Sequence, residues 1–273
     1  KGGVVPRIGL PYITVGRENE IDAFLNDIEI IGEGGAAFRF IVGKYGSGKS
    51  FLLQTIRNYV MAKNFVVVDA DLSPERRLQG TRGQGLATYK ELIRNMSTKT
   101  KPEGGALSLI LDRWISNVQQ EVMASENLSV TSAQLPGLVE KRISAVIYSL
   151  NEMVHGFDFA RLLTLYYQAY IAGDDETKAK VLKWFRGEYG TKTEARQELG
   201  VHMVITDDDW YEYLKLFACF LKRAGYAGML ILIDELVNIY KIPNAITRQY
   251  NYEKILTMYN DTMQGKAQHL GLI

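Results

Sequence analysis

One short segment constrains the fold of this chain more than any other. Residues 43–50 read Gly-Lys-Tyr-Gly-Ser-Gly-Lys-Ser, which is the pattern of a phosphate-binding loop: a glycine, four residues and then Gly-Lys-Ser. An apolar run over 38–42 precedes this loop and predicts a strand, and residues 51–61 place apolar side chains at helical spacing. Residues 65–68 predict a second strand. This βαβ pattern predicts an α/β fold around a central parallel sheet.

The glycines of the loop have a defined chemical use. They let the backbone curl until successive N–H groups point at phosphate oxygens, and the start of the following helix adds positive potential. Lys49 is placed to reach the β- and γ-phosphates, and Ser50 is placed to give its hydroxyl to Mg²⁺. The alternative, a chance glycine-rich turn, does not explain the flanking strand and helix. The predicted nucleotide-binding residues of the loop are Gly43, Lys44, Tyr45, Gly46, Ser47, Gly48, Lys49, Ser50 and Phe51.

An acidic pair completes the predicted site. Residues 229–233 are all apolar, as expected of a central parallel strand, and Asp234 and Glu235 follow at once. An acid at the tip of a neighbouring strand holds the magnesium ion in P-loop enzymes, so Asp234 is the predicted metal-side residue. Glu235 is placed to orient or deprotonate the attacking water. We therefore predict Glu235 and Lys49 as catalytic, and Ser50 and Asp234 as metal-binding.

Two other interpretations of the acids stay open. Asp234 and Glu235 could simply cap the helix that follows them. Alternatively, Asp69 or Asp71, just after the strand at 65–68, could supply the metal-side carboxylate. The phosphate loop upstream favours the functional assignment of Asp234 and Glu235 over capping. Asp69 and Asp71 lack an adjacent Asp-Glu pair at a strand end, so Asp234 is also favoured over them.

The chain divides into three parts by pattern. Residues 1–74 hold the loop and its βαβ unit, residues 75–205 read as a mainly helical insertion, and residues 206–273 resume the core with the acidic strand. Helix starts are predicted at Ser73-Pro74-Glu75 and at 206–209, the latter leading to a helix that ends near residue 222. A helix around 252–263 and the beginning of a strand end the chain.

The insertion is interrupted by breakers at 103–105, 135–137 and 172–175, and residues 159–171 place a broad apolar stripe on one helix. We interpret that stripe as core. The basic residues near the start of the insertion could form a strip for phosphate backbones, but solvated helix faces explain them better because acids lie among them. These residues are Arg76, Arg77, Arg82, Lys90, Arg94, Lys99 and Lys101.

Composition excludes several classes. Lys and Arg number 32 against 31 Asp and Glu, so no global field draws the chain to nucleic acid or to a membrane. The single cysteine, Cys219, lies among apolar residues and reads as a buried hydrophobe. No apolar stretch is long enough to span a bilayer, and no secretory signal is present, which predicts a cytoplasmic location without membrane contact. The scattered histidines do not have the spacing of a zinc site.

A segment upstream of the loop carries a first resemblance. Residues 15–21 read Val-Gly-Arg-Glu-Asn-Glu-Ile, followed by an apparent helix. This resembles the Gly-Arg-Glu box of AAA+ and STAND-type ATPases and of origin-recognition relatives, which lies beside the adenine. The resemblance implies that Gly16 and Arg17 belong to the nucleotide site, with Tyr12 or Ile13 offering a surface to the base.

Longer stretches carry a second resemblance. The segments "RIGLPYITVGRENEIDAFL", "FIVGKYGSGKSFLL", "VVVDADLSPERRLQG" and "ILIDELVNIYKI" resemble the BREX-type ATP-binding domain proteins of bacterial phage defence. This implies an ATPase that uses ATP and Mg²⁺ and works with other defence proteins, such as a helicase or methyltransferase. The sequence assigns no residue to DNA contact and leaves DNA binding and homo-oligomer formation open. The alternatives are a STAND-type scaffold or signalling switch, and an origin-recognition-like DNA-binding ATPase.

The chain starts at Lys1 and stops inside the strand that follows the acidic one, so we expect a fragment of a longer protein. The resemblance implies that a polar sensor and an arginine for the γ-phosphate follow beyond Ile273.

Overall fold

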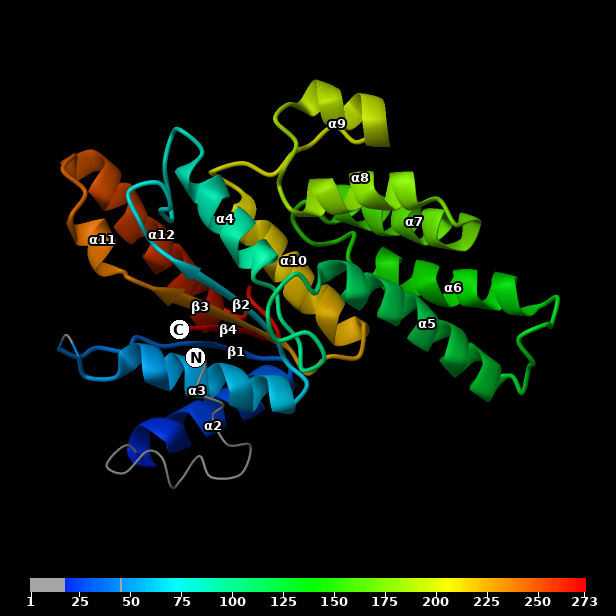
Figure 1. Cartoon of the computed structure of the whole chain (residues 1–273), viewed down its shortest axis with the longest axis horizontal. Coiled ribbons are helices and arrows are strands. Elements are labelled where there is room, and N and C mark those ends of the chain that lie inside the picture. Colours follow the sequence, from blue (N-terminus) through cyan, green and yellow to red (C-terminus); the bar gives the residue numbers. More distant parts are fainter. Residues whose placement is uncertain (1–17, 45) are drawn as a thin grey trace.

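A four-stranded parallel sheet organises the protein, and helices pack against both of its faces (Figure 1). The computed structural model describes residues 18–44 and 46–273. The strand order is β1-β4-β3-β2, so the strand that ends the chain lies between the first strand and β3. The strands are β1 (Ala36–Phe38), β2 (Val66–Asp71), β3 (Met229–Asp234) and β4 (Leu270–Leu272).

The two long strands, β2 and β3, are paired in register over six residues, from Val66 opposite Met229 to Asp71 opposite Asp234. Their apolar residues alternate between two cores because successive side chains point to opposite faces of a sheet. Val67 and Leu230 pack in the core shared with helices α2 (Glu18–Gly32) and α3 (Lys49–Ala62), whereas Val68 belongs to the larger core on the other face. A near-continuous apolar run is the pattern expected of strands buried on both faces.

Helices make up most of the remaining chain. Between β2 and β3 the chain passes through α4 to α10, and the core on that face of the sheet continues into this helical block. Figure 1 shows α2 and α3 on one side of the sheet and α4, α10 and α12 on the other. The helices are α2 (Glu18–Gly32), α3 (Lys49–Ala62), α4 (Gln84–Arg94), α5 (Leu107–Ser125), α6 (Leu135–Tyr148), α7 (Gly156–Ala172), α8 (Asp175–Phe185), α9 (Lys192–Leu199), α10 (Trp210–Arg223), α11 (Val237–Tyr240) and α12 (Ala245–Met263).

Several sequence predictions agree with these elements. The apolar stripe of 159–171 lies in α7 and faces the core, with Leu162, Leu163 and Tyr166 fully buried. Cys219 is buried in α10. The breakers at 103–105 and 172–175 separate helices, and 135–137 opens one. None of the described helices combines the length and the apolarity needed to cross a membrane.

The strand predicted at 38–42 is displaced. The structure places β1 at Ala36–Phe38, and its ladder ends where Arg39 N donates to Leu272 O (2.9 Å). Beyond that bond, Phe40 is 56% and Val42 92% exposed. These two apolar residues are therefore not buried in the described structure. The second strand is longer than the predicted 65–68, because its pairing with β3 continues to Asp71.

The helix predicted at Ser73-Pro74-Glu75 is wrong. Ser73 Oγ does accept bonds from the N–H groups of Glu75 (3.2 Å) and Arg76 (3.1 Å), so the local turn forms. It does not propagate: Arg77 N donates to Gln84 O (3.2 Å), and Asn251 Oδ1 of α12 accepts from Leu78 N (2.9 Å) and Gln79 N (3.0 Å). The first helix after β2 begins only at Gln84.

The acidic segment 206–209 precedes a helix as predicted, but its carboxylates act differently. Asp209 Oδ1 accepts from Thr206 N (2.7 Å) instead of capping α10 with its side chain. Asp207 caps a different helix, α4, by accepting from Gly83 N and Leu86 N, each at 2.7 Å. The N-cap of α4 is Gly83, which has no side chain, so the cap is supplied from a distant part of the sequence.

Replacing Asp207 with alanine is expected to lower the free energy of unfolding by about 1–2 kcal/mol, because two N–H groups at a helix start lose a charged acceptor. The neighbouring Asp208→Ala is the matched control, since Asp208 is exposed and, among the described residues, its carboxylate accepts only from the Gln79 amide (2.8 Å). Its expected cost is within about 0.5 kcal/mol. Urea unfolding of the variants measures both values, and equal midpoints would contradict the cap.

Candidate functional site

The predicted loop curls at the start of α3. Gly46 and Gly48 have φ values of 77° and 81°, a conformation that strains any residue with a Cβ. Gly48 is the N-cap of α3, which begins at Lys49. The free N–H groups and the positive end of this helix therefore face the loop, as anion binding requires.

Lys49 lies inside this curve. Its Nζ donates to the backbone carbonyls of Gly43 (3.0 Å) and Lys44 (3.1 Å). These exposed bonds hold the ammonium group over the loop. A phosphate oxygen that replaces the two carbonyls would gain a charge-assisted bond.

The hydroxyl and the carboxylate predicted to share a cation meet in the structure. Ser50 Oγ lies 3.2 Å from Asp234 Oδ2, although the residues come from α3 and from the tip of β3. Both atoms are oxygen donors, which Mg²⁺ prefers, and Mg²⁺ is commonly bound by one or two protein groups together with substrate phosphates. Among the described residues no group of three or more His, Cys, Asp or Glu could hold a metal. The residues therefore fit a cation that arrives with phosphate.

Glu235 follows in a turn of unusual backbone geometry. Its φ is 60°, and its N–H donates to Asp234 Oδ1 at 2.7 Å. Asn238 N donates to Glu235 O (3.0 Å), which closes the turn that leads into α11. A left-handed residue that is not glycine carries strain, and such strain clusters at functional sites. The turn leaves the Glu235 side chain exposed beside the Ser50–Asp234 pair.

The competing acids lie at the same edge of the sheet. A cavity of about 510 Å³ is bordered by Ser50, Asp69, Asp71, Asp234 and Glu235, among others. The exposed Asp71 is the Cα partner of Asp234 in the ladder.

Asp69 is engaged elsewhere: Arg57 Nε donates to its Oδ1 (3.2 Å), and Asn95 Nδ2 lies 3.3 Å from its Oδ2. Burial raises the pKa of the Asp69 carboxyl, and Arg57 opposes that rise. No described bond joins Asp69 or Asp71 to Ser50, so the geometry favours Asp234 as the metal-side acid.

Sequence reasoning missed the residues that support this edge. Arg57 lies seven positions after Ser50, two turns along the same helix, and its Nη2 also donates to Pro102 O (3.0 Å). Asn238 Nδ2 donates to Leu72 O (2.8 Å), which ties the Glu235 turn to the end of β2. Helical spacing from Ser50 could have suggested Arg57, but no local pattern indicates a bond between Asn238 and Leu72.

Some predicted residues lie outside the description. Tyr45, Gly16 and Arg17, together with Tyr12 and Ile13, belong to residues that the structure does not describe. The helix expected after the Gly-Arg-Glu box is α2. Phe51, in the first turn of α3, is 49% exposed.

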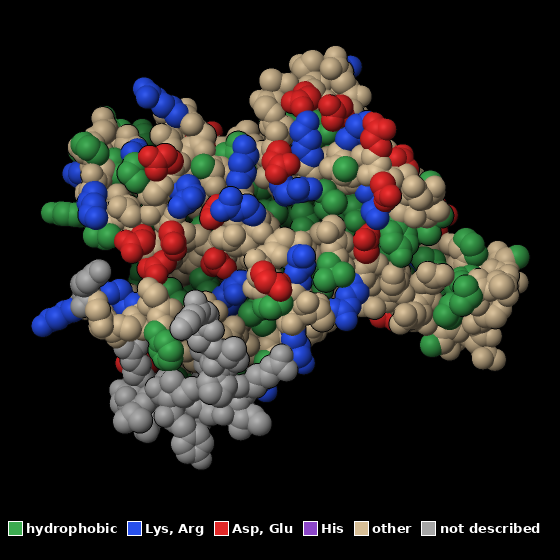
Figure 2. Space-filling view, in the orientation of Figure 1, with side chains coloured by type: hydrophobic (Ala, Val, Ile, Leu, Met, Phe, Trp, Pro, Cys, Tyr) green, Lys and Arg blue, Asp and Glu red, His purple; other side chains and the backbone are tan. Residues whose placement is uncertain are grey.

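The basic residues of the insertion do not form an unopposed strip. Arg94 Nη2 lies 2.7 Å and Arg76 Nη1 3.8 Å from the same carboxylate oxygen of Glu91. Figure 2 shows positive and negative side chains interspersed over the visible face of the molecule. The described contacts therefore favour solvated helix faces.

Comparison with known proteins adds the family. A family model described as "BREX system ATP-binding protein BrxC/D" matches residues 1–273, the whole chain. No curated protein and no solved structure matches it. The family description agrees with the site, in which a loop, an ammonium group and an acidic strand tip are suited to a nucleotide. It also implies a role in a BREX phage-defence system, beside other components of that system. The chain belongs to the BrxC/D family of BREX system ATP-binding proteins.

Proposed function

We propose that this protein hydrolyses ATP with Mg²⁺ in the bacterial cytoplasm, and that its nucleotide state acts on a DNA-associated partner complex of the defence system. The hydrogen bond between Ser50 and Asp234 carries the proposal, because it joins the loop to the acidic strand tip in a P-loop context. The strand order supports an AAA+/STAND-type core, since β4 separates the loop strand from the acidic strand. In this proposal segments 1–74 and 206–273 form that core, and 75–205 is the insertion.

Each side chain has a distinct task. Lys49 and the amides of the loop hold and orient the phosphates, which is the main requirement of phosphoryl transfer. Ser50 and Asp234 would hold Mg²⁺, which neutralises phosphate charge when bound. Glu235, exposed at the same edge, orients a water molecule and accepts its proton.

Replacing Lys49 with alanine tests nucleotide binding. We expect the dissociation constant of a fluorescent ATP analogue, titrated with Mg²⁺ into the intact protein, to rise at least about tenfold, because a charged donor to the phosphates is lost. Phosphate release should fall to background. Lys63→Ala, an exposed lysine just beyond the other end of α3, is the matched control and should leave both values unchanged. Equal affinities for the two variants would refute the assignment of the loop.

A further inference from the structure

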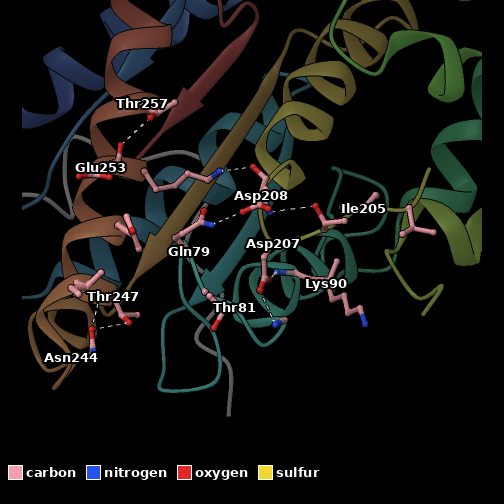
Figure 3. A pocket seen from close by; sticks show the side chains of 18 of the residues that line it. Gln79, Thr81, Lys90, Ile205, Asp207, Asp208, Asn244, Thr247, Glu253 and Thr257 are labelled. Carbon is pink, nitrogen blue, oxygen red and sulfur yellow. Dashed lines mark hydrogen bonds between the residues drawn. The ribbon is translucent and has the colours of Figure 1, made fainter. Parts of the chain in front are cut away.

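A second, larger cavity lies away from the phosphate loop. Its volume is about 1100 Å³, and it opens to solvent between α12, the start of α4 and the segments 79–83 and 204–208. Figure 3 shows Thr247, Glu253 and Thr257 on one wall, formed by α12, and Asp207, Lys90 and Thr81 on the other. We call this cavity the α12 groove.

The α12 wall offers apolar surface to a ligand. Ile246 is 65% and Tyr250 51% exposed, and they lie one turn apart on α12. Leu86 of α4 contributes a partly buried apolar side chain from the opposite wall. An exposed aromatic residue beside an aliphatic one is typical of the anchoring contacts in protein interfaces.

Two charged groups of the groove, Asp207 and Lys254, are engaged in bonds within the protein. The Asp207 carboxylate accepts from two N–H groups of α4, and Asp208 accepts from Gln79. Lys254 Nζ donates to Asp208 O (2.9 Å) above the Trp210 ring, and burial lowers the pKa of its ammonium group.

Three exposed charged groups border the groove and can meet a ligand: Lys90, and the acids Asp208 and Glu253, each of which accepts from a neutral side-chain amide. A nucleic acid presents a uniformly negative backbone and would meet Glu253 unfavourably. A polypeptide can present a basic and an acidic side chain to the two walls. The charges therefore favour a polypeptide.

Hydrogen bonds join the α12 groove to the edge of the sheet that carries Asp234 and Glu235. Asn251, one residue after Tyr250 and fully buried, accepts from Leu78 N and Gln79 N and donates to Gln79 O (2.9 Å). The same segment begins at Leu72, whose N–H donates to Asp234 O (3.1 Å). A displacement of α12 relative to this segment would therefore reach both Asp234 and the Glu235 turn.

We propose that the α12 groove docks a polypeptide segment of another BREX component, anchored by an apolar side chain on Ile246 and Tyr250 and a basic one at Glu253, and that docking changes ATP turnover. The regulatory part rests on the proposed ATPase function. The docking part stands on the groove alone, so it is measured without nucleotide.

The experiment uses short fluorescein-labelled peptides that tile the other proteins of the system, with labelled oligothymidylate as the nucleic-acid probe. Fluorescence anisotropy with the intact protein should find at least one peptide that binds tighter than about 100 µM. Tyr250→Ala and Glu253→Lys should each weaken that peptide about tenfold or more. Tyr252→Ala is the matched control, because Tyr252 is an exposed tyrosine of α12 that does not border the groove, and it should change affinity less than about twofold.

The bound peptide should also alter phosphate release in the wild type and not in Tyr250→Ala. Absence of any binding peptide, or equal binding by Tyr250→Ala, would overturn the docking site. Binding of oligothymidylate that is lost in Tyr250→Ala, without peptide binding, would assign the groove to nucleic acid instead. A third outcome is peptide binding that leaves phosphate release by the wild type unchanged, although Glu235→Gln abolishes phosphate release. This outcome would overturn the proposed regulation and leave the proposed ATPase function intact.

Discussion

Glutamine in place of Glu235 is expected to lower ATP turnover by roughly 10² or more while ATP binding stays close to that of the wild type. The reason is geometric: Asp234 and Ser50 hold the cation side of the site, whereas Glu235 is exposed in the turn beside them. Glutamine keeps the size of the side chain and removes its capacity to accept a proton. Phosphate release under saturating ATP, together with a binding titration, measures the two effects separately.

The matched control for this change is Glu103→Gln. Glu103 is an exposed glutamate that borders the same 510 Å³ cavity, so its replacement removes one negative charge nearby without touching the strand tip. Turnover within about threefold of the wild type is expected for Glu103→Gln. If Glu235→Gln turned over ATP as fast as this control, the carboxylate would have no part in the chemistry.

The second large effect concerns stability. Lys215 of α10 is only 7% exposed, and its Nζ lies 2.6 Å from Asp261 Oδ2 of α12 and 2.9 Å from Glu212 Oε1. Lys215→Met should lower the free energy of unfolding by about 3–5 kcal/mol, because it leaves the buried Asp261 carboxylate without its cation. Urea unfolding followed by circular dichroism measures the change.

The double variant Lys215→Met/Asp261→Leu separates a lost charge partner from lost packing. Replacing a buried pair by apolar residues is often nearly neutral, so most of the lost stability should return. A double variant as unstable as the single one would show that packing around the Lys215 stem, not the unpaired carboxylate, dominates. The pair joins α10 to α12, so it also holds one wall of the α12 groove against the helical block.

Local pattern predicted the elements that hold the candidate site. The start of α3 directly follows the loop, and β3 is apolar up to Asp234 because central parallel strands are buried on both faces. Carboxyl ends of parallel strands meet at one edge, which is why two segments far apart in sequence place Ser50 and Asp234 in contact. That inference needed only the period of the apolar residues and the rule for parallel sheets.

Local pattern failed where a distant side chain replaced a local partner. Ser73 offers the start of a helix, but the helix does not continue, and a buried amide on α12, Asn251, accepts from the N–H groups of Leu78 and Gln79. Asp207 belongs to the acid-rich helix start predicted at 206–209, but its carboxylate caps α4. In both cases a backbone group bonds to the nearest suitable acceptor in space, which sequence spacing does not reveal.

The sequence by itself determined the phosphate loop, the helix behind it, the acidic strand tip and the family, because each depends on residues adjacent in the chain. Only the tertiary structure decided that Asp69 is held by Arg57, that Glu235 lies in a strained turn bonded to Asn238, and that α12 and the segment 79–83 enclose a groove. The physical reason is the same throughout: hydrogen-bond partners and cavities are set by packing between elements, and packing is a property of the folded chain.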